Sequence, residues 1–132
     1  PTCWDQWFPE LARLYGLKNT DLVCYPTAIG SELDHPNFDT KYLWQHMMIS
    51  HGIANAMFVA ASNRIGIENG ITFYGSSFIS DPYGRVLVEA KRDKRSVLIA
   101  DLDLDQKRDW IELFPFFQTR RPEMYEEITK NT

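Results

Sequence analysis

The first strand expected in this chain is Leu22-Val23-Cys24-Tyr25-Pro26-Thr27-Ala28-Ile29. It is a mostly apolar run of strand length with turn-forming residues on both sides, which predicts a buried β-strand. Cys24 within it is therefore predicted to be a buried core thiol. A loop rich in Pro, Asn and acidic residues follows, and residues 40–55 then predict a helix. Residues 57–62, with Phe-Val-Ala-Ala at their centre, predict a second buried strand.

The pattern changes after this strand–helix–strand unit. Three further strands are expected in succession, joined by turns such as Asp81-Pro82-Tyr83-Gly84, and short helices are expected near both ends. The expected strands are 71–80, 85–90 and 97–104, and the expected helices are 8–15, 105–113 and 122–130. This order predicts an α/β layered fold with a mixed sheet. So few strands leave sheet edges and faces uncovered, so further partners are expected outside this chain.

Composition limits the class of protein. The 132 residues suit one domain, and the net charge of −4 is spread without a basic stripe, which argues against nucleic-acid binding. No apolar run approaches the roughly 20 residues of a membrane span, so the simplest compartment is the cytoplasm. His46 and His51 are five residues apart and His35 lies in a loop, so no metal site is predicted.

Chemistry is expected at the start of the chain, where Cys3 precedes a helix start. The positive end of a helix dipole favours thiolate, and a thiolate can attack a carbonyl or nitrile carbon. The backbone N–H of Trp4 is placed to donate to a developing oxyanion. Asp5 and Glu10 suit helix capping better than proton transfer. Trp4 and Trp7 suit either a pocket wall or the core.

Four separated blocks of sequence resemble the nitrilase superfamily of carbon–nitrogen hydrolases, in family order. They begin with the nucleophile motif Cys3-Trp4-Asp5-Gln6-Trp7-Phe8-Pro9-Glu10 and continue with 25–32, 61–66 and 73–84, while 120–125 resembles the C-terminal signature. True nitrilases usually have Trp-Glu-Asn after the cysteine. The Trp-Asp-Gln-Trp variant is most similar to the N-carbamoylputrescine amidase branch, which favours amide over nitrile chemistry.

The resemblance implies that residues 1–132 are the C-terminal part of one α-β-β-α sandwich domain, with the N-terminal part absent. It implies a Glu–Lys–Cys triad whose Glu and Lys lie in that missing part, so only Cys3 and the Trp4 backbone carry over. The implied reaction is hydrolysis of a linear amide or ureido C–N bond, with N-carbamoylputrescine giving putrescine, carbon dioxide and ammonia. The resemblance implies a homo-oligomer, and it implies no metal or organic cofactor.

Substrate binding is expected near the end of the first strand, at Pro26, Thr27 and Ala28, because ligands gather at carboxyl ends of strands in α/β sheets. Glu32, with Asp34, could attract a cationic amine tail or could belong to a solvated acidic loop. Asn63 and Arg64 could line the pocket or tie the sheet to a loop.

Two rival readings remain open. The chain could be a catalytically incomplete fragment that acts only as a structural or assembly piece, because its triad is incomplete. A redox thiol protein ranks lower, since Cys24 is a poor resolving partner for Cys3. The aromatic group Trp110, Phe114, Phe116 and Phe117 predicts either core or an interface, with a dimer contact preferred.

Overall fold

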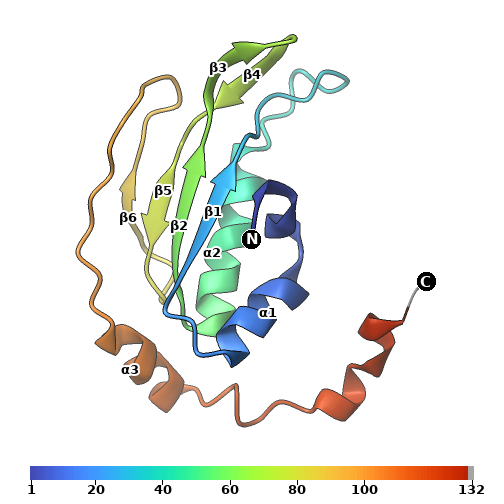
Figure 1. Cartoon of the computed structure of the whole chain (residues 1–132), viewed down its shortest axis with the longest axis vertical. Coiled ribbons are helices and arrows are strands. Elements are labelled where there is room, and N and C mark those ends of the chain that lie inside the picture. Colours follow the sequence, from blue (N-terminus) through green and yellow to red (C-terminus); the bar gives the residue numbers. More distant parts are fainter. Residues whose placement is uncertain (131–132) are drawn as a thin grey trace.

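The computed structural model describes residues 1–130. A four-stranded mixed sheet has the order β1-β2-β5-β6, with β1 spanning Leu22–Thr27, β2 Phe58–Asn63, β5 Phe78–Ser80 and β6 Val86–Glu89. β1 and β2 are parallel, and the other two pairings are antiparallel (Figure 1). The predicted α/β fold with a mixed sheet is therefore confirmed.

Helices α1 (Pro9–Leu17) and α2 (Lys41–Asn55) lie on one face of this sheet (Figure 1). Trp44 and Met48 of α2 are fully buried there against alternate residues of the strands. The Trp44 ring meets the Phe78 ring edge-on, with 5.6 Å between centroids. Because side chains alternate along a strand, only every second residue can reach this core.

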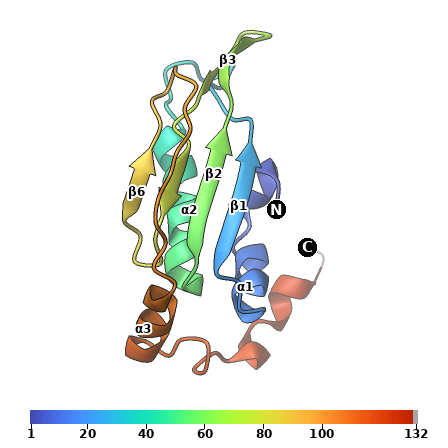
Figure 2. The ribbon, with the colours of Figure 1, turned by 60° about the vertical axis from the view of Figure 1, so that its left-hand side comes forward.

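The opposite face of the sheet carries no helix or second sheet among residues 1–130 (Figure 2). Cys24, Ala60, Ile79 and Val88 pair in one row across the four strands on this face. Cys24 is exposed, so the expectation of a buried thiol is wrong for this chain. The apolar run was correctly taken as a strand, but strand alternation turns Cys24 away from the helices that form the core.

The strand expected over 71–80 is divided into two. β4 (Ile71–Tyr74) forms a separate hairpin with β3 (Ile65–Glu68), and β5 returns to the main sheet. The break falls at Gly75 and Ser76, whose φ values of 51° and 58° cannot belong to a strand. The hairpin extends beyond the carboxyl ends of β1 and β2 (Figure 1).

Residues 97–104, expected to be a strand, pair with no other strand of the described chain: residues 97–103 have no regular secondary structure, and Leu104 lies in a turn. Val97 and Ile99 are 88% and 84% exposed. A β-strand forms only where an adjacent strand accepts and donates its backbone hydrogen bonds. An apolar sequence does not by itself provide that adjacent strand.

The helix α3 and the C-terminal segment lie outside the sheet, past the amino ends of β1 and β2 (Figure 1). α3 (Asp105–Leu113) has the predicted bounds, and its Trp110 Nε1 donates to the Ile53 carbonyl at the end of α2, 3.0 Å away. The helix expected over 122–130 is instead two short 3-10 helices, η2 (Pro122–Met124) and η3 (Glu126–Thr129). No helix of the described residues has the length and apolarity to cross a membrane.

Candidate active site

Cys3 begins a 3-10 helix, η1 (Cys3–Trp7), and is partly buried. Its φ of 41° is in the left-handed region, which is unfavourable for a residue with a side chain. The turn is closed by two hydrogen bonds, from the Thr2 N–H to Asp5 Oδ2 (2.8 Å) and from the Asp5 N–H to the Thr2 carbonyl (3.0 Å). Asp5 therefore caps the turn, as predicted. Such strained residues cluster at functional sites.

The two tryptophans of this turn have different environments. The Trp4 side chain is 71% exposed, whereas Trp7 packs against the hydrophobic core. Within residues 1–130 the Trp4 N–H has no hydrogen-bond acceptor, as expected for the first turn of a helix. The expected role of this N–H as an oxyanion donor stays a prediction.

Gln6 fixes the turn on α2. Its side chain is 1% exposed, and its Oε1 accepts from Trp44 Nε1 at 2.8 Å. Its backbone carbonyl lies 2.8 Å from Nε2 of the buried His51. On the other side η1 contacts β1, where burial, with smaller effects from Tyr15 and Asp5, raises the pKa of Tyr25 to about 12.

The four residues expected to bind substrate lie at the carboxyl end of β1 and in the loop after it. Thr27 Oγ1 donates to the Ser62 carbonyl (3.0 Å), which ties β1 to β2. Pro26, Ala28 and Glu32 are exposed. No hydrogen bond within residues 1–130 joins these four residues to η1, so their role in binding stays a prediction.

Asn63 connects three segments near these residues. Its Oδ1 accepts from the Ile29 N–H (2.9 Å), and its Nδ2 donates to the carbonyls of Ile29 (3.0 Å) and Gly75 (2.9 Å). Arg64 pairs with Glu68 at 2.5 Å and lies over the Phe73 ring. For Asn63 the structure therefore supports tying sheet to loop, whereas the Arg64 side chain contacts only the β3–β4 hairpin.

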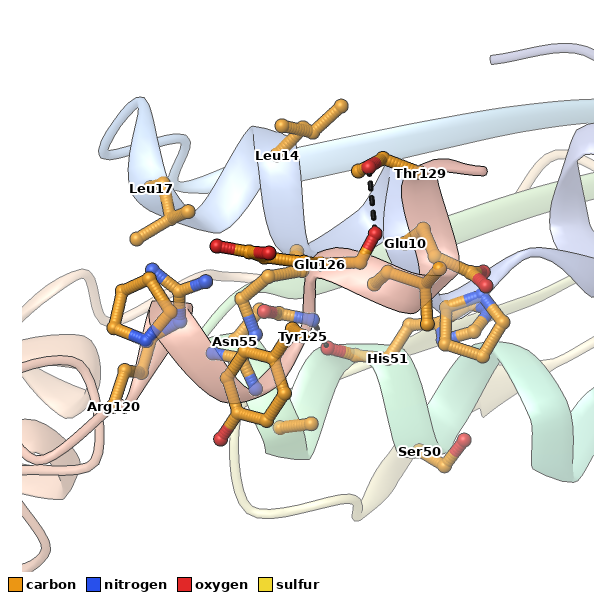
Figure 3. A pocket seen from close by; sticks show the side chains of 15 residues that line it. Glu10, Leu14, Leu17, Ser50, His51, Asn55, Arg120, Tyr125, Glu126 and Thr129 are labelled. Atoms are coloured by element: carbon orange, nitrogen blue, oxygen red, sulfur yellow. Dashed lines mark hydrogen bonds between the residues drawn. The ribbon is translucent and has the colours of Figure 1, made fainter. Parts of the chain in front are cut away.

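The larger cavity, about 820 Å³, lies between α1, α2 and the C-terminal segment, and Cys3 does not line it. Figure 3 shows Glu10, Leu14, His51, Asn55, Arg120 and Tyr125 around it. A second cavity of about 250 Å³ lies beside Tyr74 and Arg92 and also excludes Cys3. No group of three or more potential metal-ligating side chains occurs in the described residues.

The structure thus combines an α/β sheet covered on one face with a cysteine on a strained, capped turn. The sequence defines the family. Residues 2–112 match the model of the carbon–nitrogen hydrolase family, and the chain belongs to that family.

The relatives agree. The chain is 44% identical to a citrullinase of Francisella tularensis over 97% of this chain and 46% of that protein. It is 42% identical to an N-carbamoylputrescine amidase of Arabidopsis thaliana, over 96% of this chain and 45% of the relative. The chain thus spans about half the length of these relatives.

Solved structures show the same fold. A carbon–nitrogen hydrolase of Helicobacter pylori matches with a TM-score of 0.90 and 33% identity, over 98% of this chain and 48% of that one. An amidase of Nesterenkonia matches with a TM-score of 0.72 and 25% identity, over 96% and 41%. That amidase was solved with the acetamide moiety of fluoroacetamide bound covalently to its active-site cysteine.

Proposed function

We propose that this chain is the C-terminal part of a hydrolase that cleaves a linear amide or ureido C–N bond through Cys3. The observation that carries the proposal is the strained, capped turn that presents Cys3 within the segment matching the family model. The covalent adduct on the active-site cysteine of the Nesterenkonia amidase supports the same chemistry.

The reaction proceeds by covalent catalysis. The Cys3 thiolate attacks the carbonyl carbon, and the free Trp4 N–H donates to the oxygen as it gains negative charge. The C–N bond breaks, and the amine or ammonia leaves with the proton that the Cys3 thiol gave up. Water then cleaves the thioester and restores the thiol. The acyl group leaves as a carboxylic acid or, from a ureido substrate, as carbamic acid that breaks down to carbon dioxide and ammonia. A Glu as general base and a Lys that stabilises the intermediate are expected from the rest of the domain, outside these 132 residues.

The proposed substrate is N-carbamoylputrescine, which would give putrescine, carbon dioxide and ammonia. Its support is the similarity to the plant N-carbamoylputrescine amidases. Glu32 is exposed in the loop after β1, where its carboxylate can attract a cationic amine tail. Citrulline, another ureido compound, is the second candidate because of the 44% identity to a citrullinase.

Ammonia release from N-carbamoylputrescine and from citrulline, measured with the full-length gene product, tests this function. The variant Cys3→Ala should lose turnover of the preferred substrate, whereas the matched thiol variant Cys24→Ser should keep it. The higher kcat/KM identifies the substrate. Full activity of Cys3→Ala would refute Cys3 as nucleophile.

The same assay tests the rival reading. A catalytically incomplete protein with a structural or assembly role would release no ammonia from either compound or from simple ω-amides. Its Cys3→Ala variant would then behave like the unchanged protein in every assay.

A further inference from the structure

The turn that presents Cys3 depends on a pair of buried side chains from α2. Trp44 and His51 hydrogen-bond to the same residue, Gln6, one to its side chain and the other to its backbone carbonyl, both at 2.8 Å. All three side chains are almost completely buried, with exposed fractions of 0%, 3% and 1% in that order. Water therefore cannot replace either bond at low cost.

The His51 contact also defines the state of the imidazole. A carbonyl oxygen only accepts hydrogen bonds, so Nε2 of His51 must carry the proton and donate. Burial lowers the pKa of His51, although the Gln6 carbonyl and the nearby Glu10 favour the charged form. Glu10 of α1 lies next to His51 at the cavity in Figure 3. The ring thus donates from Nε2, and this bond holds it in one orientation.

We propose that His51 is a positioning residue for the nucleophile: through Gln6, it holds the strained backbone of the Cys3 turn in its reactive orientation. This inference rests on the proposed role of Cys3. The positive φ of Cys3 is unfavourable, so the surrounding contacts must impose it. The Asp5 cap fixes the start of η1, and the Gln6 bonds fix the turn on α2.

The test uses the full-length gene product and substitutions of His51 that differ in whether the new side chain can donate to the Gln6 carbonyl. In His51→Gln the amide nitrogen takes nearly the place of Nε2, so it can still donate to the Gln6 carbonyl. His51→Asn carries the same amide one carbon shorter and cannot reach, and His51→Leu carries no donor. The matched control is His46→Leu, because His46 is exposed on the same helix and meets only Tyr42 of that helix, through its backbone carbonyl and its ring.

Two quantities are measured: kcat and KM for the substrate, and the rate at which iodoacetamide alkylates Cys3, followed by peptide mass. We expect His51→Leu and His51→Asn to lower kcat by about 10- to 100-fold with little change in KM, because small misplacements of reacting groups have effects of this size. The rate at which iodoacetamide alkylates Cys3 should fall in the same variants whose kcat falls. His51→Gln should restore most of both rates, and His46→Leu should leave them unchanged.

Equal rates in His51→Asn and His51→Gln would overturn the proposal, as would unchanged kcat and alkylation in His51→Leu. If His51→Leu fails to fold, the Asn and Gln variants still decide, because both are polar and differ only in reach. Alkylation is measured without substrate, so the positioning role is tested even if neither ureido compound is turned over. Failure of the proposed function shows separately, as the absence of ammonia release from both compounds or as full activity of Cys3→Ala.

Discussion

Cys3 occupies a backbone conformation that costs on the order of 1–3 kcal/mol for a residue with a side chain. Two hydrogen bonds between Thr2 and Asp5 close the turn and offset part of this cost from within the motif. The longer-range contacts come from α2, about forty residues later in the chain, and they meet at Gln6. The conformation of the Cys3 turn thus depends on contacts within the motif and on contacts with a distant helix.

His51 gives the protein a specific pH dependence of stability. Burial lowers its pKa in the folded state, so the unfolded chain binds a proton that the folded protein does not. Its contribution is fully present above the unfolded pKa of about 6.5 and is lost as the pH falls through the folded pKa. We expect urea unfolding between about pH 7.5 and 5 to show a steeper loss of stability in the natural protein than in His51→Gln.

The control for this prediction is again on α2. His46 is exposed, so His46→Gln should retain the steep pH dependence of the natural protein. Identical pH profiles for the natural protein and His51→Gln would show that the imidazole of His51 titrates alike in the folded and unfolded states.

At the scale of elements, the carboxyl ends of β1 and β2 are organised by one side chain. Asn63 bonds both backbone groups of Ile29 and the carbonyl of Gly75, and so joins the loop after β1 to the turn before β5. This loop carries Ala28 and Glu32, two of the four residues expected to bind substrate. Sequence alone could not separate this role from pocket lining, because the partners of Asn63 lie 34 and 12 residues away.

Asn63 and Arg64 therefore differ in their expected effect on stability. Asn63→Ala removes three partly buried hydrogen bonds and should lower the free energy of unfolding by about 2–4 kcal/mol. Arg64→Ala removes an exposed ion pair, which solvent screens, and should cost much less than Asn63→Ala. Urea denaturation of both variants measures the difference, and a larger loss in Arg64→Ala would contradict this assignment.

At the scale of the whole molecule, the chain forms one covered side of a sheet and leaves the other side open (Figure 2). The exposed apolar residues of 97–104 lack a strand partner in the described chain. The chain also spans about half the length of its relatives. A second sheet packed on the open face, as the predicted α-β-β-α sandwich requires, would cover both features.

The accessibility of Cys24 to alkylation tests whether such a second sheet covers the open face. In the 132-residue chain it is exposed on the open face, so iodoacetamide should alkylate both Cys24 and Cys3. In the full-length gene product we expect Cys24 to be protected while Cys3 remains reactive. Peptide mass after short labelling measures both sites, and equal labelling of Cys24 in the two proteins would argue against a covering layer.

The aromatic group near the C-terminus is partly an internal contact of this chain. Trp110 bonds to the end of α2 and meets Tyr83 edge-on, and Arg13 lies over the rings of Phe116 and Phe117. Phe114 remains 52% exposed. The predicted dimer contact therefore stays a prediction, now limited to the exposed part of this group.

Most elements were predictable from sequence because hydrophobic periodicity and turn residues act locally. The strand from Leu22, the helix ending at Asn55 and the helix Asp105–Leu113 were all found in this way. Three of the errors share one cause. The burial of Cys24, the division at Gly75 and the unpaired segment 97–104 each depend on which neighbour a residue faces.

The sequence by itself determined the family, through blocks of residues in a fixed order, and it determined Cys3 as the candidate nucleophile, because a reactive thiol and its cap lie within a few residues of each other. Only the tertiary structure decided that His51 and Trp44 hold that turn and that Asn63 joins the loops. Hydrogen bonds between residues far apart in the chain form only after the backbone brings their atoms within about 3 Å, and no local pattern encodes that distance.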